Sequence, residues 1–429
     1  MPPSTCPTWY EARSRARQPW PAAEGRLEAA FAVVGGGLAG LSTALSLAER
    51  GVGREVVLCE AERIAVGASG RNGGMASAGF TRPLAEIERR WGRERARALF
   101  ALSAEGLGRL RRRIEAYGIA CDLVEGVAEV SWFVEADELA RTVGDSNARY
   151  GTRLEVWPRE RVQAVWRTHR YRAAAFDPDG FHLDPLALCR GLAAAAAVAG
   201  VRLYEATPVL RLRREGGRYR LDCPRATVYA DHVILCTSAV GRPPDRRLAR
   251  ALVPVASRIA VTEPLGRRLA DLVRAPFAVF DDRMATGYWR PLPGGRLLWG
   301  GGVVLFEGLS HPERALRADL ARVFPELADV RFDFVWSGRM GFARHRMPVI
   351  RPLEPGLWVA VAFGGQGLNT TAMAGELIAA ALLDGDDRFR LFDPFGLPML
   401  PGCLGRLAAQ LYYWAFMLRD RIRALRTRR

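Results

Sequence analysis

Hydrophobic positions at the start of the chain predict a strand, a turn, a helix and a second strand. An apolar run over 31–34 leads into a cluster of glycines, and beyond it Leu38, Leu41 and Leu45 recur at helical spacing. A second short apolar run, REVVLCE, follows and ends at Glu60. This order is that of a βαβ unit in a parallel sheet.

A second helix and strand are predicted downstream. Asp184 stands before Pro185 and an alanine-rich segment that runs to Gly200. An aspartate before a proline at the first helical position is typical of a capped helix start, and a glycine is typical of a helix end. We expect a helix between these residues and a short strand that ends near Glu205.

Three further runs predict a meander of neighbouring strands. Residues 209–215 and 218–223 alternate between apolar and polar positions on either side of a Gly-Gly turn, and 231–241 begins with a continuous apolar run. Alternation indicates a strand that is exposed on one face, and a continuous run indicates a buried strand.

The pattern changes beyond residue 252. The segments 252–265, 287–302 and 330–340 are strand-like and rich in aromatic residues, which predicts a large, mainly antiparallel sheet. Residues 356–382 then repeat the order seen at the start of the chain: an apolar strand, a glycine turn and a helix from about Thr370.

Composition adds little to this picture. The chain has 429 residues and a net charge of +16, and all 62 of its basic residues are arginine. The absence of lysine favours codon bias in a GC-rich genome as the source of this charge, and not a basic binding face. No nucleic-acid partner is therefore expected. The seven cysteines are scattered without a C-x-x-C pair, which predicts neither a disulfide framework nor a metal site. Without a signal peptide or a long apolar run, we expect a cytoplasmic protein.

The first glycine cluster carries a dinucleotide-binding motif. Gly35, Gly37 and Gly40 form G-x-G-x-x-G, in which the glycines allow a tight turn, close approach of pyrophosphate and close packing of helix on strand. The helix N-terminus offers free amides to the phosphates. Glu60 follows twenty residues after Gly40, where a carboxylate accepts hydrogen bonds from a ribose.

The stretch ASGRNGGM, residues 68–75, indicates a flavin dinucleotide. Gly70, Gly73 and Gly74 allow main chain to contact a cofactor, and the polar side chains between them can meet phosphate and ribitol. With the preceding motif and acid, this stretch is similar to the flavin-contacting segment of the D-amino-acid-oxidase-like family, in particular its glycine oxidase and gamma-glutamylputrescine oxidase branch. The resemblance extends over about residues 8 to 420.

The resemblance implies noncovalent FAD, because the cysteine or histidine that tethers the flavin in related enzymes is missing. It also implies an α/β (α+β) fold with a Rossmann-like FAD-binding domain and a discontinuous substrate domain on the large antiparallel sheet. The implied divisions are an FAD-binding domain of 1–85, 175–250 and 346–390, a substrate domain of 86–174 and 251–345, and a helical tail of 391–429.

The cofactor-binding residues that the resemblance implies lie in seven segments of the chain. They are Gly35, Gly37, Leu38, Ala39, Gly40, Glu60, Ala61, Ser69, Gly70, Arg71, Asn72, Gly73, Gly74, Met75, Val209, Thr237, Ser238, Trp336, Gly338, Gly364, Gly365, Gln366, Gly367, Leu368 and Asn369. In the family the last of these turns holds the pyrimidine edge of the flavin, and the dipole of the following helix stabilises the reduced ring.

The expected chemistry is oxidation of a C–N bond of an amine to an imine by hydride transfer to flavin N5, with O2 or another acceptor taking the electrons. Tyr288, Arg290, Trp336 and Met340 are the expected pocket residues, and His345, Arg290 and Gln366 the candidate catalytic ones. Met340 stands where glycine oxidases carry the arginine that grips a substrate carboxylate, so an α-amino acid held in that way is not expected.

Two alternatives remain open at this stage. The same flavin fold could act on tRNA, or the basic, aromatic C-terminal tail could dock a quinone-linked amine or amino-acid dehydrogenase on a membrane. The absence of lysine removes the residue that some members of the family use to assist oxygen, so oxidase and dehydrogenase are both possible.

Overall fold

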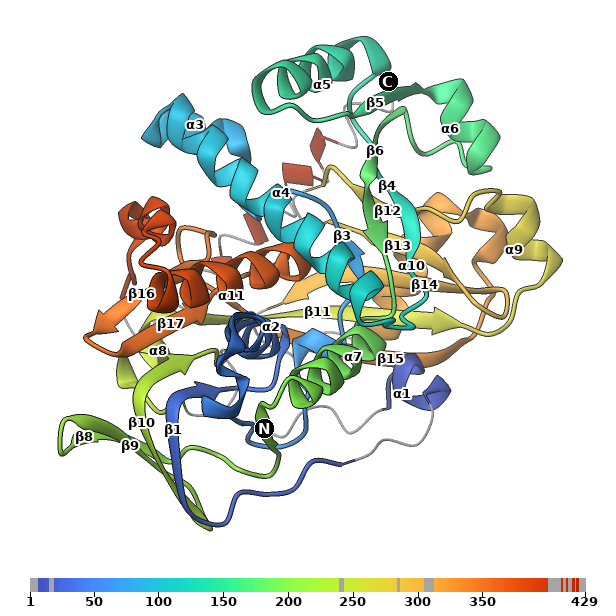
Figure 1. Cartoon of the computed structure of the whole chain (residues 1–429). Helices are drawn as coiled ribbons and strands as arrows, with labels where there is room; N and C mark the ends of the chain where they lie inside the picture. Colours follow the sequence, from blue (N-terminus) through green and yellow to red (C-terminus); the bar gives the residue numbers. More distant parts are fainter. Residues whose placement is uncertain are drawn as a thin grey trace.

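Two large sheets and a layer of helices make up the protein (Figure 1). The computed structural model describes residues 7–14, 19–238, 243–283, 286–304 and 312–399, with a few residues between 410 and 423. The expected helical tail of 391–429 therefore lies mostly outside the described residues.

The first sheet has a parallel centre, as the βαβ pattern predicts. Its strands run in the order β16-β17-β10-β1-β2-β7, and β1 pairs in parallel with both β2 and β10. The β8, β9 and β10 meander extends one side of it, as expected. The strands are β1 (Gly25–Val34), β2 (Val56–Cys59), β7 (Arg202–Tyr204), β8 (Arg211–Glu215), β9 (Arg218–Asp222), β10 (Ala226–Leu235), β16 (Val349–Glu354) and β17 (Leu357–Val361).

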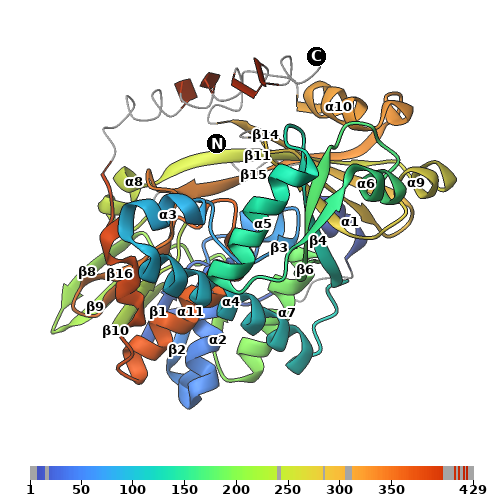
Figure 2. The same cartoon turned by 90° about the horizontal axis from the view of Figure 1, so that it is seen from above.

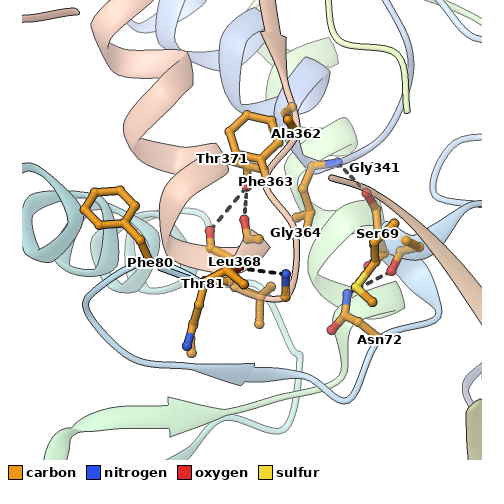
Figure 3. Close-up of a pocket in the computed structure, with 18 of the residues that line it drawn as sticks. Ser69, Asn72, Phe80, Thr81, Gly341, Ala362, Phe363, Gly364, Leu368 and Thr371 are labelled. Carbon is orange, nitrogen blue, oxygen red and sulfur yellow. Dashed lines mark hydrogen bonds between the residues drawn. The ribbon is translucent and has the colours of Figure 1, made fainter. Parts of the chain in front are cut away.

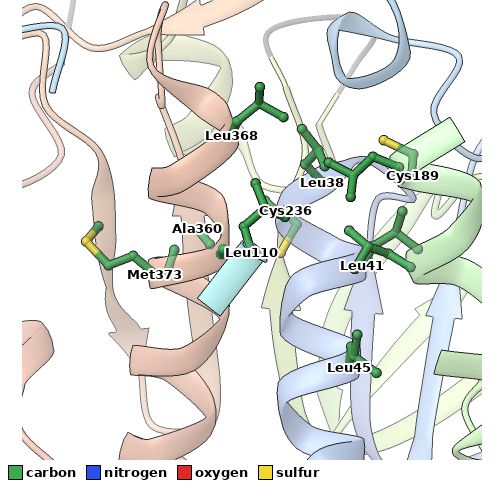
Figure 4. Packing of buried hydrophobic residues seen from close by; sticks show 14 of the residues in the cluster. Leu38, Leu41, Leu45, Leu110, Cys189, Cys236, Ala360, Leu368 and Met373 are labelled. Atoms are coloured by element: carbon green, nitrogen blue, oxygen red, sulfur yellow. The ribbon is translucent and has the colours of Figure 1, made fainter. Parts of the chain in front are cut away.

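Four helices pack together beside this sheet. They are α2 (Leu38–Leu47), α4 (Arg93–Ala116), α7 (Pro185–Val198) and α11 (Gly367–Leu383). In the hydrophobic core, Leu38 of α2 lies on the side of Leu368 of α11, and Leu41 and Leu45 lie on the side of Cys189 of α7 (Figure 4). The two helices approach closely at Gly375, where an added Cβ would lie 2.5 Å from the Ser42 carbonyl carbon.

The second sheet confirms the predicted, mainly antiparallel architecture. Its order is β15-β11-β14-β13-β12-β4-β6-β3, with β5 against β6, and only β12 and β4 pair in parallel among the described strands. The strands are β3 (Met75–Ala76), β4 (Val124–Ser131), β5 (Glu155–Pro158), β6 (Ala173–His182), β11 (Val253–Thr262), β12 (Ala278–Asp281), β13 (Tyr288–Leu292), β14 (Arg296–Val304) and β15 (Phe332–Phe342).

The remaining helices lie around this frame, and Figure 2 shows α5 and α6 on the side of the second sheet. They are α1 (Trp9–Arg13), α3 (Leu84–Trp91), α5 (Ala136–Tyr150), α6 (Arg159–Val165), α8 (Arg246–Ala251), α9 (Arg267–Leu272) and α10 (Pro312–Val323). Short 3₁₀ segments cover Gly53–Glu55, Ala68–Gly70, Pro325–Leu327 and Arg388–Phe395, and a π segment covers Ala48–Val52. No described helix is long and apolar enough to cross a bilayer.

The helix boundaries agree with the sequence in one case and differ in another. The Asp184 carboxylate accepts from the amides of Leu186 and Ala187 at 2.9 and 3.0 Å, so the predicted cap of α7 is confirmed. The expected start of α11 near Thr370 is wrong, because α11 begins at Gly367. The predicted division into two domains remains a prediction, and its boundary at 174/175 falls inside β6.

Candidate active site

The turn between β1 and α2 brings main chain to the N-terminus of the first helix. Gly35 has φ +114°, and a Cβ on Gly40 would lie 1.8 Å from the Gly35 carbonyl oxygen, so a side chain at Gly40 requires the backbone to move. The Leu41 amide donates to the Gly37 carbonyl oxygen at 2.9 Å. The first amides of a helix have no partner four residues back, which leaves those of Ala39 and Gly40 available to an anion.

Ser69 lies beside this helix N-terminus. The Leu38 amide donates to Ser69 Oγ at 2.9 Å, and a Cβ on Gly37 would come within 2.7 Å of the same oxygen. The loop of 68–75 and the β1–α2 turn therefore meet at the atoms where a diphosphate binds in a Rossmann unit.

Glu60 follows β2, and its carboxylate lies against the same turn. It accepts from the amides of Gly36 and Glu62 at 2.6 and 2.9 Å. Burial raises the pKa of Glu60 above its usual range, and the two amides oppose that shift. Each carboxylate oxygen has a second lone pair, so the group can also accept from a ribose hydroxyl.

The Asn72 side chain fixes the second glycine loop (Figure 3). Its amide nitrogen donates to the carbonyl oxygens of Ala68 and Ser69 at 3.0 and 2.8 Å, and its oxygen accepts from the Gly74 amide at 2.8 Å. Gly74 has φ +77°, and a Cβ there would lie 2.0 Å from the Leu183 carbonyl oxygen. The loop therefore requires glycine at this position.

A third turn joins β17 to α11. Thr81 Oγ1 accepts from the Gly365 amide at 3.1 Å, and the Thr371 hydroxyl donates to the Gly367 carbonyl oxygen at 2.6 Å (Figure 3). Ala362 and Gly364 both have positive φ, at +65° and +60°. This sharp turn points the N-terminus of α11 toward the same space as the other two loops.

All three loops line one cavity of about 2320 Å³, which exceeds the size of an ordinary small-molecule pocket and leaves room for a dinucleotide together with a substrate. Most of the residues expected from the sequence lie on its wall. They are Gly35, Gly37, Leu38, Ala39, Glu60, Ala61, Ser69, Arg71, Asn72, Gly73, Gly74, Met75, Val209, Thr237, Ser238, Tyr288, Gly338, Met340, Gly364, Gly365, Gln366, Gly367 and Leu368.

Six expected residues lie behind that wall instead of on it. Two of them are glycines in packed helical segments, where a Cβ would strike neighbouring backbone, and the other four are absent from the lining of the cavity. They are Gly40, Gly70, Arg290, Trp336, His345 and Asn369.

Arg290 supports the second glycine loop from behind. Its buried guanidinium donates to the carbonyl oxygens of Gly73 and Leu183 at 2.7 and 2.9 Å, and to Tyr10 Oη at 3.2 Å. Its remaining nitrogen lies 3.2 Å from His182 Nδ1. Burial and the Arg290 charge lower the pKa of His182 to about 3, so that imidazole is neutral and accepts from Arg290.

Trp336 and His345 each form a hydrogen bond within the protein. The Trp336 indole donates to the Arg71 carbonyl oxygen at 2.8 Å and packs edge-on against Tyr10. His345 Nδ1 accepts from the Met347 amide at 3.0 Å, and burial lowers the pKa of His345 to about 4. His345 does not line the cavity, and its Nε2 is buried without a hydrogen-bond partner among the described residues.

The second sheet forms the opposite wall of the cavity. Across its inner face, Tyr288 pairs with Phe280 on one side and with Gly300 on the other. The Tyr288 hydroxyl lies 3.1 Å from Ser257 Oγ, and its ring would lie 2.8 Å from a Cβ on Gly73. Tyr288 therefore stands where the sheet meets the second glycine loop.

On β15, alternation decides which side chains reach the cavity. Gly338 and Met340 line it, and Arg339 between them does not, as period-2 geometry requires. This part of the wall therefore presents the thioether of Met340 to the cavity, and not the guanidinium of Arg339.

Glu129 on β4 is a residue that the sequence reasoning missed. It lines the cavity and is exposed to it, although protein surrounds it. Burial, and then the nearby Asp282 and Asp281, raise the pKa of Glu129 to about 7. The only signal in the sequence was that Glu125, Val127 and Glu129 occupy alternate positions, which puts them on one face of a strand. This signal is weak, because an acid on a strand face usually points into solvent.

Comparisons with known proteins agree with this geometry. The family described as DAO, FAD dependent oxidoreductase, matches residues 30–381. The chain belongs to this family. It is 32% identical over 405 residues to gamma-glutamylputrescine oxidoreductase of Escherichia coli (strain K12), which covers 93% of each chain. It is also 30% identical over 388 residues to a probable oxidoreductase, OrdL, of Haemophilus influenzae, with 88% of each chain covered.

The fold agrees as well. The crystal structure of glycine oxidase from Geobacillus kaustophilus superposes with a TM-score of 0.71 at 23% identity, over 88% of this chain and all of that one. The chain is thus an FAD-dependent oxidoreductase of the DAO family.

The residues present fit FAD. Thr237 Oγ1 faces the cavity region beside Gly35, is buried, and has no hydrogen-bond partner among the described residues, so a ligand can satisfy it. The glycine-lined loops leave room that side chains would fill. Gly35, Gly37 and Ser69 would hold the diphosphate, and Glu60 the ribose.

Proposed function

We propose that this DAO-family enzyme oxidises the C–N bond of a primary or secondary amine to an imine, which water then hydrolyses. The observation that carries the proposal is the continuity of one cavity from the N-terminus of α2 to the inner face of the second sheet. A substrate amine on that face has the glycine loop of 68–75 as its neighbour. FAD, when bound, supplies the acceptor for the hydride that leaves the carbon next to nitrogen.

The protein's own contribution is positioning and exclusion of water. The sheet covers the glycine loops, and Tyr288, held by Ser257, is a rigid wall where the two meet. Holding the amine carbon in a fixed orientation, away from bulk water, lowers the entropy cost of the transfer. No acid–base residue is assigned, because neither His345 nor Arg290 lines the cavity.

An amine, and not an α-amino acid held by its carboxylate, is the proposed substrate class. Met340 supports this assignment, because a thioether cannot form the bidentate contact that an arginine makes with a carboxylate. The likeness to gamma-glutamylputrescine oxidoreductase points in the same direction, toward an amine derived from a polyamine.

Anaerobic titration of the purified yellow protein tests the proposal. We expect a panel of alkylamines, diamines and γ-glutamylated diamines to bleach the flavin band, and glycine and alanine to bleach it far more slowly. Rapid bleaching by the amino acids and none by the amines would contradict it. Release of hydrogen peroxide in air, without an added dye, would identify O2 as the acceptor and exclude the quinone-linked alternative.

A further inference from the structure

Glu129 lies within the substrate part of the cavity, on the same row of the sheet as Tyr288. It pairs with Ala175 on one side and with Phe280 on the other, and Phe280 pairs with Tyr288. Strands are about 4.8 Å apart, so two strand spacings put the Glu129 backbone about 10 Å from that of Tyr288. The Tyr288 ring is next to the glycine loop, and Glu129 is therefore well removed from it.

The surface between these two residues is apolar. Phe280 stands directly between them, and Val127 and Ala175 line the cavity beside Glu129. Such a surface suits a methylene chain that runs along the sheet from Tyr288 to Glu129.

The Glu129 carboxylate has no hydrogen-bond or ion-pair partner within the part of the chain that the structure describes. Its acidic neighbours do have partners. Asp281 is paired with Arg283 and accepts from the Gly287 amide at 3.0 Å, and Asp282 accepts from the Ser131 hydroxyl at 2.7 Å. Of these three neighbouring acids, Glu129 is the one whose carboxylate lacks a partner among the described residues.

The local charge is negative. Asp177, on the neighbouring strand, accepts from the Asp179 amide at 3.0 Å, and no arginine is paired with it among the described residues. The guanidinium of Arg283 is shared between Asp281 and Asp319, at 2.5 and 2.7 Å. Arg423 lies near Asp282, but the carboxylates of Glu129, Asp177, Asp281 and Asp282 still outnumber Arg283 and Arg423, and this surplus of negative charge favours a cationic ligand.

We propose that Glu129 binds a second positive charge of the substrate, so that the enzyme's substrate is a diamine or polyamine derivative whose distal ammonium lies at β4 while the reacting amine lies beside Tyr288. This inference rests on the proposed amine oxidation. Separation of the two ends matters, because a carboxylate next to the reacting nitrogen would keep it protonated and block hydride loss. An ammonium at Glu129 would also lower the raised pKa of that carboxyl toward its usual value.

The strand supplies a matched control. Glu125 lies on the same face of β4, lines the same cavity and carries the same side chain, but it is paired with Arg111. Glu125→Gln removes a carboxylate that is already neutralised, and Glu129→Gln removes the vacant one.

The test compares 1,6-diaminohexane with hexylamine as reductants of the holoenzyme. We expect the wild type to favour the diamine in kcat/KM by tenfold or more. Glu129→Gln should lower kcat/KM for the diamine about 10- to 100-fold, which matches the 1.5–3 kcal/mol of a hydrogen bond to a charged group, and leave hexylamine unchanged. Glu125→Gln should leave both unchanged, and Glu129→Arg should shift preference toward 6-aminohexanoate.

Equal rates for the two amines in the wild type, or an equal loss for both in Glu129→Gln, would overturn the inference. A binding measurement separates its failure from that of the proposed reaction. If neither amine bleaches the flavin, amine oxidation is contradicted, and the rise in Tm of the oxidised holoenzyme then decides the cation site. Stabilisation by the diamine that is lost in Glu129→Gln supports the site, and equal Tm values with diamine and hexylamine overturn it.

Discussion

The two walls of the cavity are built in different ways. The wall on the side of α2 and α11 consists largely of main chain at glycines, where an added Cβ at Gly74 would lie 2.0 Å from a carbonyl oxygen. The wall on the second sheet consists of side chains, such as Tyr288, Phe280 and Met340, on strands far apart in sequence. The first wall tolerates almost no change, and the second can change its chemistry one side chain at a time.

This difference explains how one family keeps one cofactor and varies its substrates. Main-chain amides and glycine turns bind a diphosphate whatever the substrate is. Alternate positions on strands place side chains in the cavity without altering the backbone. The contrast predicts that substitutions in the first wall destroy the holoenzyme and that those in the second wall alter preference.

The largest effect is expected for Gly40→Ala. The added methyl would lie 1.8 Å from the Gly35 carbonyl oxygen, so α2 must move away from the end of β1, at a cost of about 4 kcal/mol or more. We expect purified protein without bound FAD, measured by its absorbance, and a lower urea midpoint.

Gly144→Ala is the control for that substitution. Gly144 lies within α5, and nothing is within 4 Å of a Cβ built there. The alanine should leave FAD content unchanged and raise stability slightly, since alanine favours helix. Normal flavin content in Gly40→Ala would contradict the packing argument for the first wall.

A smaller loss is expected for Arg290→Met, which removes the support behind the glycine loop. The carbonyl oxygens of Gly73 and Leu183 would lose buried donors, which costs about 1–3 kcal/mol for each group left unsatisfied. We expect a lower free energy of unfolding and faster loss of FAD on dilution. Arg153→Met, at a pair with Asp179 that is largely exposed, should cost at most about 1 kcal/mol. Equal costs for the two variants would argue against a supporting role for Arg290.

The first wall could be predicted from the sequence because its contacts are local. Gly35, Gly37 and Glu60 act through a single βαβ unit, and the spacing of such a unit is visible in one chain segment. Asn72 was also found, because its hydrogen bonds close within a few residues of the loop itself, whereas Ser69 Oγ accepts from the amide of Leu38 at the start of α2, within the same N-terminal segment.

The second wall could not be predicted in the same way. Trp336 and Arg290 were expected in the pocket because both lie on strands of the right sheet, but their side chains bond to the loop from behind. Tyr10 explains part of this, since a short N-terminal helix that the sequence did not connect with the site fills that space. Glu129 was missed because its position in the cavity depends on the pairing of β4 with β6 and β12, which are far from it in the sequence.

Met340→Arg should then alter substrate preference without disturbing the first wall. A guanidinium at this cavity-facing position can pair with a substrate carboxylate, so kcat/KM for α-amino acids should rise about tenfold or more. FAD content should stay unchanged. Met340→Leu, which keeps the size but adds no charge, should show no gain. A gain in both variants, or in neither, would show that position 340 does not face the reacting substrate.

The smallest effect concerns the stability of the protein without substrate, and it depends on pH. Burial, and then the charges of the neighbouring Asp282 and Asp281, raise the pKa of Glu129 from 4.5 to about 7, and Asp177, Arg283 and Tyr288 also line this part of the cavity. A carboxyl with a raised pKa in the folded state destabilises that state once it ionises, so the penalty is absent below pH 4.5, grows as the pH rises and is complete above pH 7.

Urea unfolding of Glu129→Gln and the wild type measures this penalty directly. The two proteins should be equally stable at pH 4.5, and the variant should be more stable at pH 8, by less than about 1 kcal/mol because solvent in the cavity screens the exposed carboxylate. Glu125→Gln should show no such gain, since its carboxylate has Arg111 as a partner. Saturating 1,6-diaminohexane should reverse the order at pH 8, because a ligand that binds the ionised carboxylate stabilises only the wild type. A residue that binds a cationic substrate should behave in this way, because its unpaired charge destabilises the fold until the substrate neutralises it. If Glu129 had no role in binding, the difference in unfolding free energy between Glu129→Gln and the wild type would be the same at both pH values and with or without the diamine.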